Sequence, residues 1–115
     1  MIVIDLLLAT ICFSGQCYPA LIGVDTPTGH FNLVQRITEQ PGYGGDVLQF
    51  HETDDAWYGI HRVFLLNKSQ HRDKRLLSSK VSDRIITKGC INVQPEVYEK
   101  LRDCCSNMEL IIKKN

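Results

Sequence analysis

The stretch "RIITKGCINV", residues 84–93, places Cys90 directly after Gly89 and before an isoleucine. Two interpretations of Cys90 compete. Free cysteine is commonly a small buried hydrophobe, so a structural thiol is the simpler hypothesis. The alternative is a nucleophile presented at the end of a strand. Gly89 favours this alternative, because glycine lets the backbone turn sharply and lets nearby amide groups point at a developing oxyanion.

A thiol attacks well only as the thiolate, so a catalytic cysteine needs a base, usually a histidine, or an electropositive setting. The chain has four histidines, and three of them are expected to be solvated: His30, His51 and His71. His61 differs, because it lies in the apolar segment "WYGIHRVF", where an imidazole must find partners. Alone it is most simply a satisfied core residue. Together with Gly89 and Cys90, it completes the set that acyl transfer requires.

The other cysteines bear on whether Cys90 is free. Five cysteines leave one thiol over even if all the others pair. Cys12 and Cys17 flank "FSGQ", a hairpin turn that would let them face each other, whereas a ring between the neighbours Cys104 and Cys105 is strained. The simpler interpretation is that all five are reduced core residues, so the disulfide state stays open at this level.

Composition limits the class of protein. A chain of 115 residues supports one core and predicts a single domain over residues 1–115. Acidic and basic residues balance at 13 each, which disfavours nucleic acid and anionic membranes as partners. The apolar start "MIVIDLLLATICFSGQCYPA" contains Asp5, and no Lys or Arg precedes Arg36. We therefore expect strands there, with no membrane insertion and no evident export signal in this chain.

Alternating apolar residues and Gly/Pro punctuation predict a β-rich domain. The expected strands are 2–7, 10–13, 17–23, 30–37, 47–52 and 56–66. Residues 67–83 are polar and basic, which indicates a long loop or a short exposed helix. "PEVYEKLRDCC" predicts a helix that begins at Pro95, and residues 108–115 predict an edge strand with terminal lysines. The expected fold is mainly β (β-rich α+β), mostly antiparallel, with one packed helix near the C-terminus.

Four segments, in this order, resemble the catalytic domain of L,D-transpeptidases, the YkuD family. "TPTGHF" (26–31) is similar to that family's Thr-Pro-x-Gly-x-Phe turn, and "YGIHRV" (58–63) to the strand that carries its histidine. "TKGCIN" (87–92) resembles the Ser/Thr-x-Gly-Cys-Ile/Val-Asn/Arg signature, and "PEVYEKL" (95–101) the helix behind it. The similarity runs from about Ile2 to the final strand and implies a compact β-sandwich or barrel.

The resemblance assigns roles to single residues. Cys90 would be the nucleophile and His61 its general base, with the second nitrogen of the imidazole held by a backbone carbonyl. The amides of Gly89 and Cys90 would form part of the oxyanion hole. The residues expected to meet substrate are Thr87, Lys88, Asn92 and Tyr58. The chain departs from the family in having Lys88 where many members have histidine, and in a longer gap between His61 and Thr87.

The implied reaction is acyl transfer on peptidoglycan tetrapeptide stems, with a thioester at Cys90 and release of D-alanine. The acceptor would then decide between 3–3 cross-linking, D-amino-acid exchange and hydrolysis as an L,D-carboxypeptidase. The resemblance further implies no cofactor, a monomer, and a periplasmic or secreted location in a bacterial envelope.

Three alternatives are kept. A secreted wall-modifying effector of the same fold is one, and a non-catalytic peptidoglycan-binding module, with Lys88 as the mark of lost turnover, is another. The third, a zinc site made by His51, His61 and Cys90, has no CxxC, HxxxH or HExxH spacing in its support. Arg72, Lys74 and Arg75 could meet an anionic stem peptide, but a solvated charged loop is the simpler interpretation of their segment.

Overall fold

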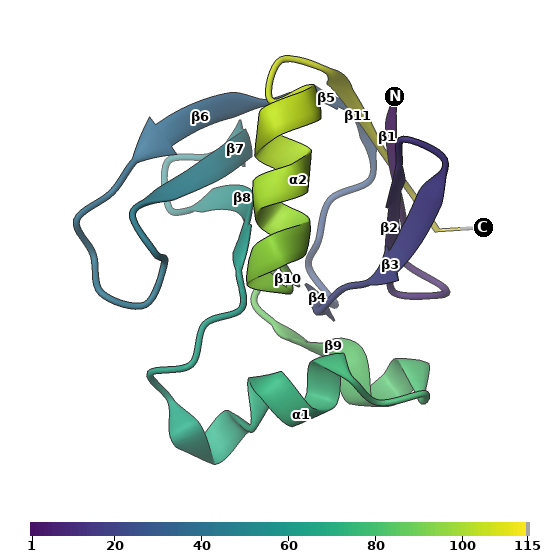
Figure 1. Cartoon of the computed structure of the whole chain (residues 1–115), viewed down its shortest axis with the longest axis vertical. Coiled ribbons are helices and arrows are strands. Elements are labelled where there is room, and N and C mark those ends of the chain that lie inside the picture. The colour runs from purple at the N-terminus through teal and green to yellow at the C-terminus, as the bar shows by residue number, and fades with distance from the viewer. Residues whose placement is uncertain (115) are drawn as a thin grey trace.

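The computed structural model describes residues 1–114. Two sheets lie on either side of a helix, and a smaller helical segment lies below them in the view of Figure 1. In chain order the elements are β1 (Ile2–Asp5), β2 (Thr10–Phe13), β3 (Gln16–Pro19), β4 (Ile22–Gly23), β5 (Gly29–Asn32), β6 (Val34–Ile37), β7 (Asp46–Glu52), β8 (Trp57–Arg62), η1 (Lys68–Gln70), α1 (Arg72–Leu76), η2 (Val81–Arg84), β9 (Ile85–Thr87), β10 (Ile91–Val93), α2 (Pro95–Cys105) and β11 (Glu109–Lys113).

The larger sheet has the order β3-β2-β1-β11-β5, and the second has the order β10-β8-β7-β6. Most neighbours are antiparallel, but β1 with β11, β8 with β10, and β4 with β9 run parallel. The prediction of a mainly β, mostly antiparallel fold with a helix beginning at Pro95 is confirmed. The short helix α1 adds to it within the polar segment 67–83.

The core lies where the inner faces of both sheets meet α2. Strands β1, β2 and β11 alternate buried and partly exposed residues, so each presents one apolar face. Tyr98 and Leu101 of α2 are fully buried in the same cluster as Ile4 of the larger sheet and Ile60 and Ile91 of the second. The helix therefore fills the space between the two sheets, and the apolar pattern of α2 accounts for its position.

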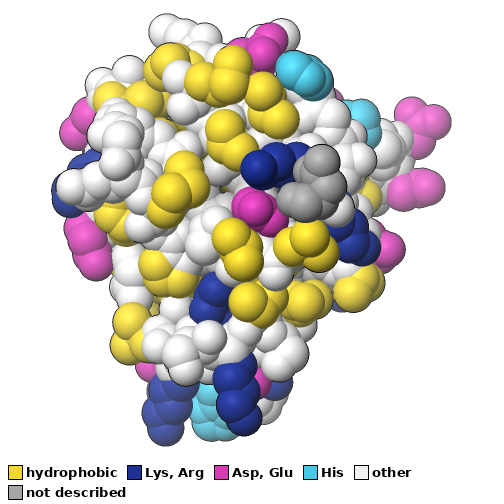
Figure 2. Space-filling model, turned by 90° about the vertical axis from the view of Figure 1, so that its right-hand side faces the viewer, with side chains coloured by type: hydrophobic (Ala, Val, Ile, Leu, Met, Phe, Trp, Pro, Cys, Tyr) yellow, Lys and Arg dark blue, Asp and Glu magenta, His cyan; other side chains and the backbone are white. Residues whose placement is uncertain are grey.

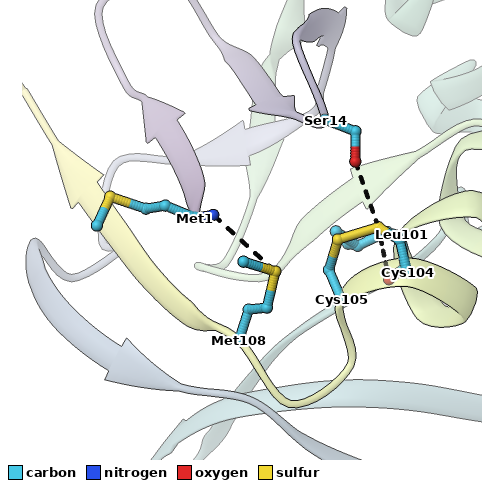
Figure 3. Close-up of a disulfide and its surroundings, with 6 residues drawn as sticks. All are labelled: Met1, Ser14, Leu101, Cys104, Cys105 and Met108. Carbon is cyan, nitrogen blue, oxygen red and sulfur yellow. Dashed lines mark hydrogen bonds between the residues drawn. A yellow bond between two sulfur atoms is a disulfide. The ribbon is translucent and has the colours of Figure 1, made fainter.

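Two disulfides reinforce the region around the C-terminal end of α2. Cys12 and Cys17 pair across the hairpin of β2 and β3, where they are direct register partners. Cys104 and the neighbouring Cys105 form the other bond, and the Ser14 hydroxyl at the hairpin tip donates to Cys104 Sγ at 3.7 Å (Figure 3). The four paired cysteines leave Cys90 as the free thiol.

Several predictions of strand bounds and position were wrong, and the expected strands 2–7 and 56–66 end earlier, at Asp5 and Arg62. The final strand β11 is not an edge strand, since it pairs with β1 on one side and β5 on the other. The expected strand 30–37 divides at buried Leu33 into β5 and β6, which belong to different sheets. The expected strand 17–23 likewise divides into β3 and β4. Within residues 1–114, no helix is long and apolar enough to cross a membrane.

Candidate functional site

The register between β8 and β10 brings the predicted nucleophile and base to one face. These strands are parallel neighbours, and Asn92 is the direct partner of His61. Side chains two residues apart on an extended segment share a face, so Cys90 lies on the same side as Asn92. Leu21 holds the other edge of β10 through two backbone hydrogen bonds with Asn92 of 2.8 and 2.9 Å. Cys90 and His61 accordingly line one pocket of about 420 Å³.

His61 is 2% exposed and is held at both ring nitrogens. Its Nδ1 lies 2.7 Å from the carbonyl oxygen of Arg62, so Nδ1 must carry a hydrogen and donate. Nε2 therefore has the free lone pair, which is the form a general base needs. Burial lowers the pKa of His61 to about 4, with a further lowering by the Arg72 charge, although the bond to the Arg62 carbonyl raises it. The imidazole is neutral at pH 7.

The amide of Asn92 occupies that lone pair in this structure. Asn92 Oδ1 accepts hydrogen bonds from Arg72 Nη1 at 2.9 Å and from the Phe64 amide at 3.3 Å. With its oxygen committed to two donors, Asn92 turns its Nδ2 to His61 Nε2, 3.3 Å away. Asn92 is fully buried. It thus fixes the imidazole plane, and its bond to Nε2 must yield when that nitrogen takes a proton.

Cys90 is half-buried, with Sγ 3.9 Å from the carbonyl oxygen of Trp57. Burial raises the pKa of the thiol, while the Gly59 amide and the Arg72 charge act in the opposite direction. A raised thiol pKa beside a lowered imidazole pKa means that both groups are uncharged in the resting protein. Attack on a carbonyl then requires a base that removes the thiol proton as the bond forms.

The loop before Cys90 is held by two threonines. Thr87, which is buried, donates from its hydroxyl to the Cys90 carbonyl at 2.6 Å and accepts from the Gly89 amide at 3.1 Å. Thr26 of the "TPTGHF" turn accepts from the Gly23 amide and donates to the Gly89 carbonyl, each at 3.0 Å. The Gly89 amide therefore donates to Thr87 in this structure, and its expected part in an oxyanion hole stays a prediction.

Gly89 itself has a structural reason to be glycine. Its φ is +138°, in the region that side chains rarely adopt, and a Cβ there would overlap the Tyr58 ring. Tyr58 therefore lines the pocket by packing against the loop. Lys88 is exposed at the pocket rim, and the positive charge that lowers the pKa of Cys90 comes from Arg72, not from Lys88.

The pocket contains residues that the sequence did not single out. Three aromatic side chains line it in addition to Tyr58: Tyr43, Trp57 and Phe64. The Tyr43 ring meets His61 edge-on, with 4.7 Å between the ring centroids. Tyr43 comes from "EQPGYGGD", a segment whose glycines predict a flexible loop. Nothing in the neighbouring sequence indicates that Tyr43 would pack against His61. Gln70 also lines the pocket, next to Arg72, which was named from the sequence for an anionic stem peptide, and both come from the polar segment 67–83.

An ion-pair network behind the pocket supports both the Tyr43 loop and His61. Arg62 Nη1 donates to Asp46 Oδ1 at 2.8 Å and to the Tyr43 carbonyl at 3.2 Å. Burial alone would raise the pKa of Asp46, but hydrogen bonds from Arg62 and Gln35 lower it overall. The Arg62 carbonyl also accepts a hydrogen bond from His61, so Arg62 connects the imidazole to Asp46 and the Tyr43 loop.

The other histidines lie elsewhere. His30 is exposed and pairs with Glu109 at 3.3 Å, and His71 is exposed at the start of α1. His51 packs against the rings of Phe31 and Tyr58. In residues 1–114 no three His, Cys, Asp or Glu side chains gather as they would around a metal ion.

The sequence matches no family model and no curated protein. Solved structures are more informative. The chain resembles an L,D-transpeptidase from Xylanimonas cellulosilytica at 16% identity, with a TM-score of 0.60 over 97% of this chain and 59% of that one. An L,D-transpeptidase from Stackebrandtia nassauensis has 15% identity, a TM-score of 0.59 and coverages of 99% and 55%.

A third similar structure is an L,D-transpeptidase from Mycobacterium smegmatis, at 19% identity, with a TM-score of 0.54 and coverages of 97% and 57%. The present chain thus spans somewhat more than half the length of each of these three. Identity is low in every case, but nearly the whole chain superposes each time. This protein has the fold of the L,D-transpeptidases.

Proposed function

We propose that the protein is a cysteine acyltransferase that acts on peptidoglycan tetrapeptide stems. The observation that carries the proposal is that one pocket is lined by both Cys90, which is a free thiol, and a neutral His61 whose Nδ1 is fixed by a backbone carbonyl. The fold of L,D-transpeptidases agrees with this chemistry. We assign Thr87, Lys88, Asn92 and Tyr58 to the surroundings of the substrate.

The reaction follows from the two uncharged groups. As Cys90 Sγ bonds to the carbonyl carbon of the third stem residue, the thiol proton passes to His61 Nε2, and the carbonyl oxygen becomes an oxyanion. His61 then gives this proton to the departing amine, the carbon–nitrogen bond breaks, and D-alanine leaves. A thioester on Cys90 remains. His61 is neutral again, so the site has the same net charge before and after the step.

The acceptor determines the product. A stem amine would give a 3–3 cross-link, a free D-amino acid an exchanged stem, and water a tripeptide. The proposal includes a periplasmic or secreted setting, because the substrate is there, and a wall-modifying effector belongs to the same chemistry. A non-catalytic peptidoglycan-binding module is the competing function, and the bond between Asn92 and His61 Nε2 is the observation that favours it.

Mass spectrometry of tetrapeptide muropeptides tests the proposal. The protein and its Cys90→Ala and His61→Ala variants are incubated with the muropeptides, and thermal unfolding verifies that each variant is folded. We expect D-alanine release that requires both residues, and the second product then identifies the acceptor. A thiol-directed carbapenem should add its mass to the wild-type protein and not to Cys90→Ala. Folded wild-type protein that releases no D-alanine and forms no adduct would favour the binding module.

A further inference from the structure

Arg72 reaches the Cys90 pocket from a segment, residues 67–83, in which most side chains are exposed. Figure 2 shows basic side chains gathered at the lower end of the molecule, where Figure 1 places α1. Arg75 donates to the Asp83 carbonyl, and Lys74 lines an adjoining depression that Arg72 shares and Cys90 does not. Arg72 is half-buried and lines the same pocket as Cys90 and His61. Of the basic side chains in residues 67–83, Arg72 is therefore the one that brings a positive charge to the Cys90 pocket.

The Arg72 guanidinium is fixed before any ligand arrives. Its Nε donates to Gln70 Oε1 at 2.8 Å and its Nη1 to Asn92 Oδ1 at 2.9 Å. The guanidinium carbon lies 5.6 Å from the centre of the Phe64 ring. Both hydrogen-bond acceptors are neutral amides, and within residues 1–114 no carboxylate lies within ion-pair distance of Arg72.

A partly desolvated cation without a counter-charge is costly, so a pocket that keeps one is suited to an anionic ligand. Arginine has five N–H donors, and the two hydrogen bonds to Gln70 and Asn92 leave three for a ligand. The planar guanidinium presents its N–H groups as a fork, and this fork matches the two oxygens of a carboxylate.

We propose that Arg72 binds the terminal carboxylate of the residue that leaves the stem. The inference rests on the proposed function, and it names the residue that recognises the leaving group. His61 Nε2 must reach the departing amine, whose own carboxylate is only two bonds from that nitrogen. Arg72 is separated from Nε2 by a single amide group, that of Asn92. The leaving carboxylate is thus the substrate anion that the reaction places nearest to Arg72.

A pair of substrates tests this assignment. One is a tetrapeptide stem that ends in free D-alanine, and the other is the same stem with a terminal carboxamide. Wild-type protein should process the acid with a kcat/KM about 10–100-fold above that of the amide, as a charge-assisted fork implies. Arg72→Gln should bring the ratio of kcat/KM for the acid to kcat/KM for the amide to about 1, whatever the change in absolute rate that follows from losing its bond to Asn92. Arg72→Lys, which keeps the charge but not the fork, should fall between.

Lys74→Gln is the matched control, because it removes a positive charge from the same helix and should change neither substrate. An equal loss on acid and amide in Arg72→Gln, or a wild type that does not discriminate, would overturn the assignment. Thermal unfolding shows whether each Arg72 variant is folded. If Arg72→Gln is not folded, the acid-to-amide ratio of Arg72→Lys is the deciding measurement.

A binding measurement separates this inference from the proposed function. NMR titration of folded Cys90→Ala protein with the two peptides requires no turnover. Preference for the acid that is lost in Cys90→Ala/Arg72→Gln supports the carboxylate site even if the wild type releases no D-alanine. Equal binding of both peptides, or binding of neither, rejects the site, and D-alanine release by the wild type would still support the acyltransferase.

Discussion

The pH dependence of D-alanine release is the sharpest test of the resting state of the site. Because burial lowers the pKa of His61 to about 4, the base should stay neutral through the mildly acidic range. With that value, about 90% of His61 is neutral at pH 5, so activity should fall by only about a tenth between pH 7 and pH 5. An ordinary histidine with a pKa of about 6.5 would lose about 25-fold over the same range.

The sign follows from the reaction. His61 acts as a base, so protonation removes activity, and the loss begins only as the pH falls through its folded-state pKa. Ionisation of Cys90 does not affect the pH–rate profile between pH 5 and pH 7, because the pKa of the thiol is raised and the thiol stays protonated over this range. The terminal carboxylate of the stem also stays ionised there, since such groups titrate near pH 3.5.

The assay is kcat/KM for D-alanine release from pH 4 to pH 8 at constant ionic strength, because this parameter reports ionisations of the free enzyme. NMR titration of the His61 ring protons in the free protein gives the same pKa without catalysis. A decrease of about 25-fold by pH 5, with His61 titrating near 6.5, would refute the buried neutral base.

Two further predictions concern stability. Asp46→Asn leaves Arg62 without its buried counter-charge and should lower the free energy of unfolding by about 2 kcal/mol in urea. Glu109→Gln, which removes an exposed partner, should change it by less than 1 kcal/mol, and equal effects would contradict the network's role. Replacing both Cys12 and Cys17 by serine opens a short loop, so we expect a loss of about 2 kcal/mol, or roughly 10 °C in melting temperature, by calorimetry. An unchanged melting temperature would argue against that disulfide in solution.

The sequence was most informative where local pattern and burial coincide. The strands through Ile4 and Ile60 and the helix beginning at Pro95 follow from apolar periodicity, and the structure confirms each of them. The position of the last strand could not be predicted, because the lysines at its end are typical of an edge. Pairing of β11 with β1 joins the two ends of the chain, and such long-range neighbours leave no local trace in a single sequence.

In the candidate site, too, some residues could be predicted from local sequence, whereas the roles of others depend on tertiary neighbours. Cys90 and His61 could be named from their motifs, since glycine before a cysteine and a histidine inside an apolar strand are local anomalies. The role of Asn92 depends on the parallel register that sets it beside His61, and that register is a tertiary fact. Tyr43 lay in a glycine-rich loop whose composition concealed its packing against His61.

Arg72 shows why a charged segment cannot be interpreted from composition alone. The segment 67–83 has the basic, serine-rich character of a solvated loop, and most of it behaves as one. Its first helical residue is different, because Asn92 and Gln70 hold the guanidinium inside the pocket at 2.9 and 2.8 Å. The same contact commits Asn92 Oδ1 and so directs Nδ2 to His61. A segment that looks dispensable thus positions the Asn92 amide, which orients His61, and the proposed carboxylate site at Arg72 would link recognition of an anion to proton transfer at His61.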